Sequence, residues 1–209
     1  MRNQKQFLLN AGFSVIEADF IQTQNTEANL EDIKDNLIFT SQNAIRSVLA
    51  MKEIGILKNK DCFCVGSKTK SLLEKNGFKV IVATDYAAEL AAVISNEYQQ
   101  QTFTFFSGNL RQDTLPDSMQ NKNIDFNEIG VYKTVLMPNK INTFIDGILF
   151  FSPSGVESYL ASNSIIDQTC FCIGTTTAKA LENKTRKVVI ANQPSVENVI
   201  IQTIKYYKA

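Results

Sequence analysis

Short apolar runs alternate with longer segments of helical period along most of the chain. Each run is rich in β-branched or aromatic residues, and an amphipathic segment follows it. The runs are NLIFT (36–40), DCFCV (61–65), KVIVA (79–83), TFTFF (102–106), GILFF (147–151), TCFCI (169–173) and KVVIA (187–191). The helical segments cover about residues 42–53, 68–76, 86–100, 109–121, 153–162, 175–183 and 194–207. This alternation predicts an α/β fold with parallel sheets.

Two consecutive units of this pattern occur twice. CFCVGSKTKSLLE (62–74) resembles CFCIGTTTAKALE (170–182) in its strand, glycine turn and helix start. FTSQNAIRSVLA (39–50) and FFSPSGVESYLA (150–161) precede them at nearly the same offset. Because both matches keep their order, duplication explains them better than chance. The sequence therefore predicts two similar parallel-sheet lobes of flavodoxin-like type.

Two further segments are extended without belonging to this alternation. EADFIQTQ (17–24) and VYKTVLMP (131–138) are β-prone, and we expect them to pair as a two-stranded β linker. The middle lobe would then be inserted in the other. The predicted division is 1–18 with 139–209 for the terminal lobe, 26–128 for the inserted lobe, and 19–25 with 129–138 for the linker.

The overall charge gives no reason to expect a charged macromolecular partner. Lysine and arginine together number 21, as do aspartate and glutamate. This balance argues against binding to nucleic acid or to an anionic membrane. The N-terminal apolar run is too short for a signal peptide, and no apolar stretch has membrane-spanning length. We therefore expect a cytoplasmic protein, monomeric by default.

The four cysteines form two C-x-C pairs, at residues 62 and 64 and at residues 170 and 172. Residues two apart in a strand share a face, and a structural zinc site usually has wider ligand spacing. We predict reduced cysteines buried in the core and no metal site, with a redox or metal role as the weaker alternative. Histidine is absent. Any catalysis must therefore use tyrosine, carboxylates, amines or backbone amides.

Five strand-to-helix turns are rich in glycine and hydroxyl groups. They are TSQN (40–43), GSKT (66–69), SGNL (107–110), SPSG (152–155) and GTTT (174–177). In parallel sheets such turns lie at the ligand-binding edge, and helix N-termini attract anions. A single turn of this kind is most simply a helix cap. Five together favour an anion site, with Arg111 and Lys68 as the nearest basic residues. No P-loop or dinucleotide glycine motif occurs.

Several of these segments, taken together, resemble the uroporphyrinogen-III synthase family. The motifs are FSGNLRQDTLP (106–116), VYKT (131–134), FFSPSG (150–155), IGTTTAKAL (173–181), TSQNA (40–44) and CVGSKT (64–69). The resemblance implies two α/β lobes, one inserted in the other, with a β linker and an active site in the cleft. It also implies a cofactor-free reaction on one small-molecule substrate, hydroxymethylbilane. This linear tetrapyrrole would close to uroporphyrinogen III with loss of water and inversion of its last ring through a spiro intermediate. Unaided, the same substrate closes to the uninverted isomer.

The resemblance also assigns site residues. Tyr132, in VYKT, matches the family's functionally implicated tyrosine and would donate a proton to the departing hydroxyl, since a phenol is protonated at neutral pH. A linker tyrosine packed against a lobe is the alternative. The implied substrate-binding residues are Thr40, Ser41, Gly66, Ser67, Thr69, Gly108, Asn109, Ser152, Ser154, Gly155, Gly174, Thr175 and Thr176.

Two expectations remain beside this assignment. The first is a transient contact with the enzyme that precedes it in the pathway. The second is an alternative function, a non-catalytic two-lobed binder of a small polyanion. The family usually begins with a strand, whereas QKQFLLNAG (4–12) predicts a helix almost at once.

Overall fold

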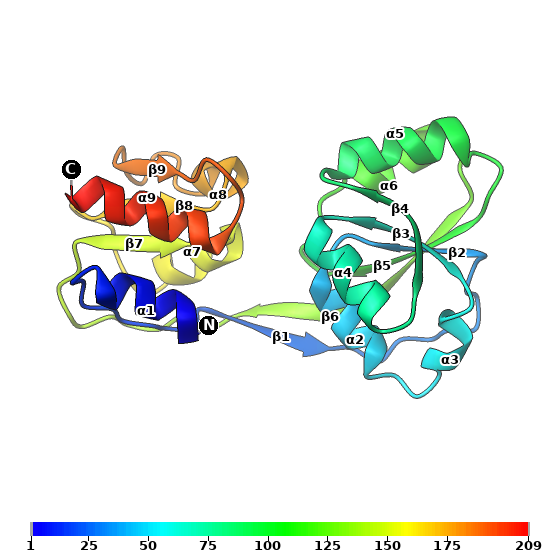
Figure 1. Cartoon of the computed structure of the whole chain (residues 1–209), viewed down its shortest axis with the longest axis horizontal. Helices are drawn as coiled ribbons and strands as arrows, with labels where there is room; N and C mark the ends of the chain where they lie inside the picture. Colours follow the sequence, from blue (N-terminus) through cyan, green and yellow to red (C-terminus); the bar gives the residue numbers. More distant parts are fainter. Residues whose placement is uncertain (1, 209) are drawn as a thin grey trace. The chain divides into compact units, whose positions relative to one another are not determined.

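The computed structural model describes residues 2–208, and it divides into two compact units (Figure 1). Thr23–Thr134 forms one unit, which we call the inserted unit. Met1–Gln22 and Val135–Ala209 form the other, which we call the terminal unit. The first unit thus lies within the chain of the second.

The inserted unit contains a sheet of parallel strands. The strands are β1 (Ile21–Asn25), β2 (Asn36–Phe39), β3 (Asp61–Val65), β4 (Lys79–Thr84), β5 (Phe103–Gly108) and β6 (Phe126–Leu136). β1 is the further strand, which pairs with β6 at the edge of the sheet. The order across the sheet is β1-β6-β5-β2-β3-β4, and the neighbouring pairs from β6 to β4 are all parallel. The predicted α/β class is therefore confirmed. The strand order differs from that of flavodoxin. There the first parallel strand lies between the second and the third, whereas here the first, β2, lies between the second, β3, and the fourth, β5.

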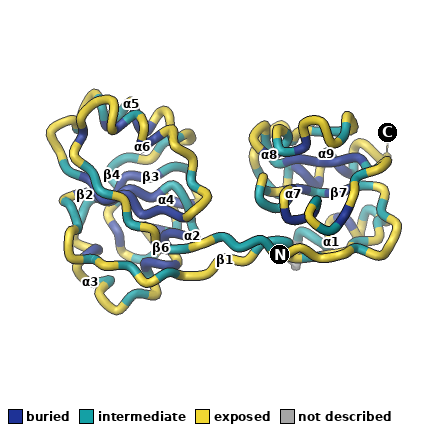
Figure 2. Tube along the Cα trace, turned by 180° about the vertical axis from the view of Figure 1, so that it is seen from behind, coloured by how far each residue is buried: buried dark blue, intermediate teal, exposed yellow. Residues whose placement is uncertain are grey.

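Helices cover both faces of this sheet. They are α2 (Gln42–Leu49), α3 (Ile54–Leu57), α4 (Ser67–Lys75), α5 (Ala87–Glu97) and α6 (Thr114–Asn121). Phe39, Cys62 and Cys64 pack with residues of α2 and α4, whereas Ile38 and Phe63 pack with residues of α5 and α6. Alternate residues of one strand thus enter opposite cores, which is why these strands are apolar throughout. Figure 2 shows the resulting buried centre of the unit.

The terminal unit has a smaller sheet. Its elements are α1 (Arg2–Asn10), β7 (Gly147–Phe150), α7 (Pro153–Leu160), β8 (Thr169–Cys172), α8 (Thr175–Lys179), β9 (Val188–Ile190) and α9 (Val196–Lys208). The strands are parallel in the order β7-β8-β9. Cys170 and Cys172 pack with residues of α7 and α8, whereas Phe171 contacts Tyr206 and Tyr207 of α9. The helix predicted at the start of the chain is confirmed.

The sequence repeat reappears in the strand registers. In the inserted unit Phe39 is opposite Cys64, and in the terminal unit Phe150 is opposite Cys172. β2-β3-β4 and β7-β8-β9 are also adjacent in the same order. The similarity extends over three strands only, because β5 and β6 of the inserted unit have no counterpart among the described strands of the terminal unit.

The two extended segments pair with each other as β1 and β6. The amide of Thr26 donates to the carbonyl of Val131 at 3.0 Å, and that of Met137 donates to the carbonyl of Phe20 at 2.8 Å. Residue numbers increase along β1 while those of the paired residues decrease along β6, so the two strands are antiparallel. β6 is longer than the predicted linker, because its first half pairs with β5.

Three predicted helices differ from the observed ones. The helix expected at 42–53 ends at Leu49, and α3 is a separate helix that begins only at Ile54; α8 is shorter than its predicted span. The helix expected from residue 109 begins only at Thr114. Residues 109–113 form a loop instead, in which Asn109 and Arg111 bind β6. Within residues 2–208, no helix is both long and apolar enough to cross a bilayer.

Candidate functional site

The carboxyl end of β2 carries a capped helix start. Ser41 is the N-cap of α2, and its Oγ accepts a hydrogen bond from the amide of Asn43 at 3.1 Å. Its φ of −144° and ψ of 136° are extended, as an N-cap requires. Thr40 and Ser41 are both half-buried. The cap interpretation of this turn is therefore correct, and the Ser41 hydroxyl also has a second partner.

That second partner is Tyr132. Its phenol donates a hydrogen bond to Ser41 Oγ at 3.2 Å. The Tyr132 ring lies directly over Gly108, where an added β-carbon would stand 2.3 Å from ring atom Cζ. Gly108 is opposite Tyr132 in the β5–β6 pairing, just after a register shift. The structure thus brings together Ser41, Gly108 and Tyr132, three of the residues that the sequence assigned to the site.

The side chain of Asn109 is hydrogen-bonded to β6, the strand that carries Tyr132. Its Oδ1 accepts from the amide of Thr134 at 2.8 Å, and its Nδ2 donates to the carbonyl of Thr134 at 3.2 Å. The side-chain amide thus imitates a neighbouring strand next to Tyr132. Sequence reasoning did not identify this role of Asn109.

Arg111 is engaged by carboxylates. Its Nε and Nη2 donate to Glu128 at 2.7 and 2.9 Å, and Nη1 contacts Asp113. Ser107 also donates to Glu128, at 2.5 Å. Burial alone would raise the pKa of Glu128, but the hydrogen bonds from Arg111 and Ser107 outweigh it and lower that pKa. The bonds to Glu128 raise the pKa of Arg111. Arg111, one of the two basic residues nearest the predicted anion site, is therefore already paired with carboxylates of the protein itself.

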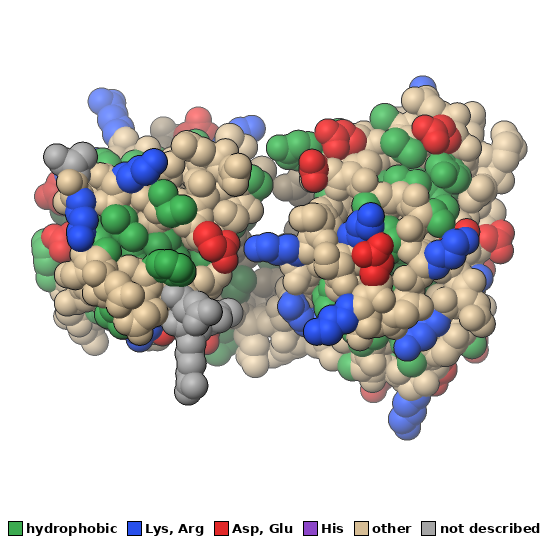
Figure 3. Space-filling view, in the orientation of Figure 1, with side chains coloured by type: hydrophobic (Ala, Val, Ile, Leu, Met, Phe, Trp, Pro, Cys, Tyr) green, Lys and Arg blue, Asp and Glu red, His purple; other side chains and the backbone are tan. Residues whose placement is uncertain are grey.

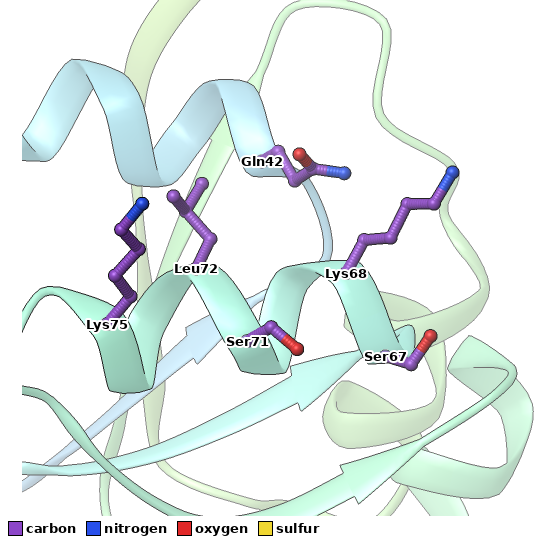
Figure 4. Close-up of a pocket in the computed structure, with 6 residues that line it drawn as sticks. All are labelled: Gln42, Ser67, Lys68, Ser71, Leu72 and Lys75. Carbon is purple, nitrogen blue, oxygen red and sulfur yellow. The ribbon is translucent and has the colours of Figure 1, made fainter.

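Lys68 lies beside a shallow pocket of about 350 Å³ between α2 and α4. The pocket is lined by Gln42, Ser67, Lys68, Ser71, Leu72 and Lys75. In Figure 4, Leu72 and Lys75 point from α4 towards α2. Among the described residues neither lysine has an ion-pair partner, whereas Lys70 pairs with Glu74 at 3.9 Å. Lys68 is thus an available cation near the turn at Gly66.

The turn at Gly66 begins α4. Gly66 has a φ of +89°, which side-chain-bearing residues rarely adopt, so this position favours glycine. Ser67 is exposed, but Thr69 is only 5% exposed. Of the two predicted hydroxyl contacts in this turn, only Ser67 presents its side chain to solvent.

In the terminal unit, the equivalent turns lie at the ends of β7 and β8. Ser152 caps α7 by accepting from the amide of Gly155 at 3.0 Å, and it shares a hydrogen bond of 3.0 Å with Ser154. At the end of β8, Gly174 is the N-cap of α8, and Thr175 and Thr176 are exposed. These turns therefore offer hydroxyl and amide donors. In the view of Figure 3, basic and acidic side chains are interspersed over each unit.

All four cysteines are free and buried, as predicted. Burial raises the pKa of Cys62 and Cys170 to about 12 and that of Cys64 and Cys172 to about 11. Their thiols are therefore protonated at neutral pH. Across the described residues, no group of three or more His, Cys, Asp or Glu side chains could hold a metal ion.

Sequence reasoning missed Ser107, Glu128 and Thr134. Glu128 is the sole acidic residue within β6, and that isolation was the available signal. The role of Thr134 could not be found, because its backbone, not its side chain, binds Asn109.

These observations define the class: an α/β protein with two parallel sheets, hydroxyl-bearing turns at their carboxyl edges and a tyrosine hydrogen-bonded to one of those turns. The sequence model of the family described as uroporphyrinogen-III synthase HemD matches residues 4–201. The chain belongs to this family, and it is a lyase of porphyrin and heme biosynthesis.

Individual relatives agree. The chain is 28% identical over 196 residues to uroporphyrinogen-III synthase from Chlorobaculum parvum, covering 81% of this chain and 79% of the relative. The fold matches the crystal structure of uroporphyrinogen-III synthetase from Helicobacter pylori with a TM-score of 0.75 and 20% identity, and the match covers 90% of this chain and 91% of the other. A mutant of the Thermus thermophilus synthase matches with a TM-score of 0.66, 13% identity and coverage of 99% and 95%. The two structures show the same fold.

Proposed function

We propose that the enzyme closes hydroxymethylbilane into uroporphyrinogen III, with Tyr132 as the proton donor to the departing hydroxyl. Family membership supports the reaction. The observation that carries the role of Tyr132 is its hydrogen bond to Ser41, at the carboxyl end of β2. In a chain without histidine, a positioned phenol is a suitable acid.

The proposed reaction begins with the loss of the hydroxyl group as water. The carbon–oxygen bond of the hydroxymethyl group breaks, and its electron pair leaves with the oxygen. Tyr132 supplies the proton that makes the leaving group water, and the positive charge spreads over the adjacent pyrrole as an azafulvene cation. The terminal ring then attacks this cation through its substituted carbon, which gives the spiro intermediate. Fragmentation and reclosure invert the ring, and the proton lost on rearomatisation can return to the tyrosinate.

Ser41 is suited to both states of Tyr132. A serine hydroxyl has one hydrogen and two acceptor lone pairs. In the resting site its oxygen accepts from Asn43 and from Tyr132, which leaves its own hydrogen free. Once Tyr132 has given up its proton, this hydrogen can be donated to the tyrosinate. Such a charge-assisted bond stabilises the developing anion.

The substrate's carboxylates would be bound by strand-to-helix turns. The proposed contacts are hydroxyl and amide groups of Thr40, Ser41, Gly66, Ser67, Ser152, Ser154, Gly155, Gly174, Thr175 and Thr176. Thr69, which the sequence also assigned, is buried and its amide donates to the carbonyl of Gly66 at 3.0 Å, so it stabilises the turn instead. The helix starts at residues 41, 66 and 152 supply amides with a positive partial charge. Lys68 adds a cation beside the second of these. Because several weak contacts fix the chain ends, the main catalytic contribution is orientation.

Two expectations from the sequence belong to this proposal. The free, buried cysteines suit a reducing compartment such as the cytoplasm. A transient contact with the preceding enzyme would protect a reactive substrate during transfer.

The test is an isomer assay. Purified protein is mixed with freshly generated hydroxymethylbilane, and the products are oxidised and separated as uroporphyrin isomers. Formation of isomer III above the protein-free control is expected. Isomer I alone would reject the synthase reaction, and if the substrate were nevertheless bound, the polyanion-binder alternative would follow.

The variant Tyr132→Phe separates the role of Tyr132 from the reaction itself. It should lower kcat by up to about 10²-fold, within the range of general acid catalysis, and leave the preference for isomer III in place. Unchanged kcat would remove Tyr132 from proton transfer.

A further inference from the structure

We propose that Gly108 and Asn109 are positioning residues that hold Tyr132 in its reactive place, and that they do not contact the substrate. This inference deepens the proposed function and rests on the role of Tyr132 given there. It is carried by three contacts of one short segment, residues 107–111, with β6.

The first contact is the ring of Tyr132 on Gly108. An added β-carbon at Gly108 would lie 2.3, 2.5 and 2.8 Å from ring atoms Cζ, Cε2 and Cε1 of Tyr132. Real contacts of this kind stay beyond 3.0 Å, so any side chain here must displace the phenol. Gly108 itself is buried beneath the ring. Its backbone is therefore covered by Tyr132, which argues against direct substrate contact.

The second contact is the Asn109 amide on the backbone of Thr134. Both the amide and the carbonyl of Thr134 are hydrogen-bonded to this one side chain, at 2.8 and 3.2 Å. β5 ends at Gly108, which is opposite Tyr132. Thr134, two residues further along β6, therefore has no residue of β5 beside it. Asn109 thus replaces the missing partner strand. Without it, β6 would be held at the residues that aim the phenol by β1 alone, on its other edge.

The third contact holds β6 on the other side of Tyr132. Glu128, four residues earlier, receives hydrogen bonds from Ser107 and Arg111. The segment therefore binds β6 both before and after Tyr132, while Gly108 accommodates the ring between them. This arrangement also explains why residues 109–113 form a loop in place of the expected helix.

A matched pair of glycine variants tests the first contact. Gly108→Ala introduces the clashing β-carbon, whereas Gly130→Ala places one on the same strand as Tyr132 with nothing within 4 Å. The readout is the ¹³C resonance of Tyr132 in tyrosine-labelled protein, assigned by its loss in Tyr132→Phe from the spectrum of six tyrosines. We expect the resonance to move in Gly108→Ala and to stay in Gly130→Ala. Equal spectra would overturn the inference, and this readout does not depend on activity.

A double-mutant cycle tests the second contact. If Asn109 acts through Tyr132, Asn109→Ala should lower kcat on the order of tenfold in the native chain and have little effect in the Tyr132→Phe background. If Asn109 contacts the substrate, the two losses should multiply and KM should rise. Multiplying losses would overturn the positioning role while leaving the proton-transfer role of Tyr132 intact.

Asn163 supplies the control for this cycle. Its side chain makes a similar pair of backbone hydrogen bonds in the terminal unit, to the carbonyl of Asn139 at 2.7 Å and from the amide of Ile141 at 2.8 Å. Asn163 is also buried and donates to the carbonyl of Tyr159 at 3.1 Å, whereas Asn109 is exposed. Asn163→Ala should therefore lower the unfolding temperature at least as much as Asn109→Ala without moving the Tyr132 resonance. If Tyr132→Phe alone left kcat unchanged, the proposed proton transfer would fail, and the resonance would still decide whether Asn109 positions the ring.

Discussion

The phenol of Tyr132 donates to Oγ of Ser41 at 3.2 Å, although 91 residues separate them along the chain. The same Ser41 oxygen accepts from Asn43 at the start of α2. One atom therefore couples the end of β2, the first turn of a helix and the proposed proton donor.

We expect Ser41→Ala to affect both stability and catalysis. Loss of the N-cap should cost about 1 kcal/mol of unfolding free energy, and loss of the bond to Tyr132 should lower kcat by roughly tenfold. Denaturant titration and isomer-resolved kinetics measure the two effects. Ser195→Ala is the control, because Ser195 accepts from the amide of Asn198 at the start of α9 and has no part in the site. A similar kcat in the two variants would contradict the role of Ser41.

Glu128 should make stability depend on pH. Its folded-state pKa is lowered, so its carboxylate stabilises the fold above its unfolded pKa of about 4.3. That stabilisation should be lost as the pH falls through the lower folded value. At pH 7, Glu128→Gln should cost about 1–2 kcal/mol, since it removes the charge that binds Arg111. Between pH 7 and pH 3, by denaturant titration, the difference from the native chain should shrink.

Asp167→Asn is the matched control for Glu128. Asp167 pairs with Lys187 at 3.1 Å, but its side chain is 84% exposed. Exposed pairs contribute little, so this variant should stay near the native chain at every pH. The same pH profile for both variants would show that Glu128 is not specially stabilised.

The four cysteines should resist thiol reagents in the folded protein. Burial removes access and raises their pKa values to about 11 or 12, so little thiolate exists at pH 8. Labelling with an aromatic disulfide reagent should therefore follow the rate of unfolding, and all four should react rapidly in guanidinium. Rapid labelling of one thiol without denaturant would revive the redox interpretation.

Sequence patterns predicted local features well and distant contacts poorly. Each apolar run became a strand, and the predicted hydroxyl caps Ser41 and Ser152 were found. The segment from Asn109 was wrongly expected to be helical. The sequence from residue 109 has the periodicity of a helix, but Asn109 and Arg111 instead bind Thr134 and Glu128 of β6. Tertiary hydrogen bonds outweighed a weak local preference.

By itself, the sequence determined the α/β class, the repeated strand and turn units, and the reliance on a chemistry without histidine. These properties follow from residue type and from periodicity over a few residues. Only the tertiary structure decided that β2 lies between β3 and β5, that Tyr132 reaches Ser41, and that Gly108 lies beneath its ring. Each of these depends on which distant strands become neighbours. That choice minimises the free energy of the whole packed sheet, and no local segment encodes it.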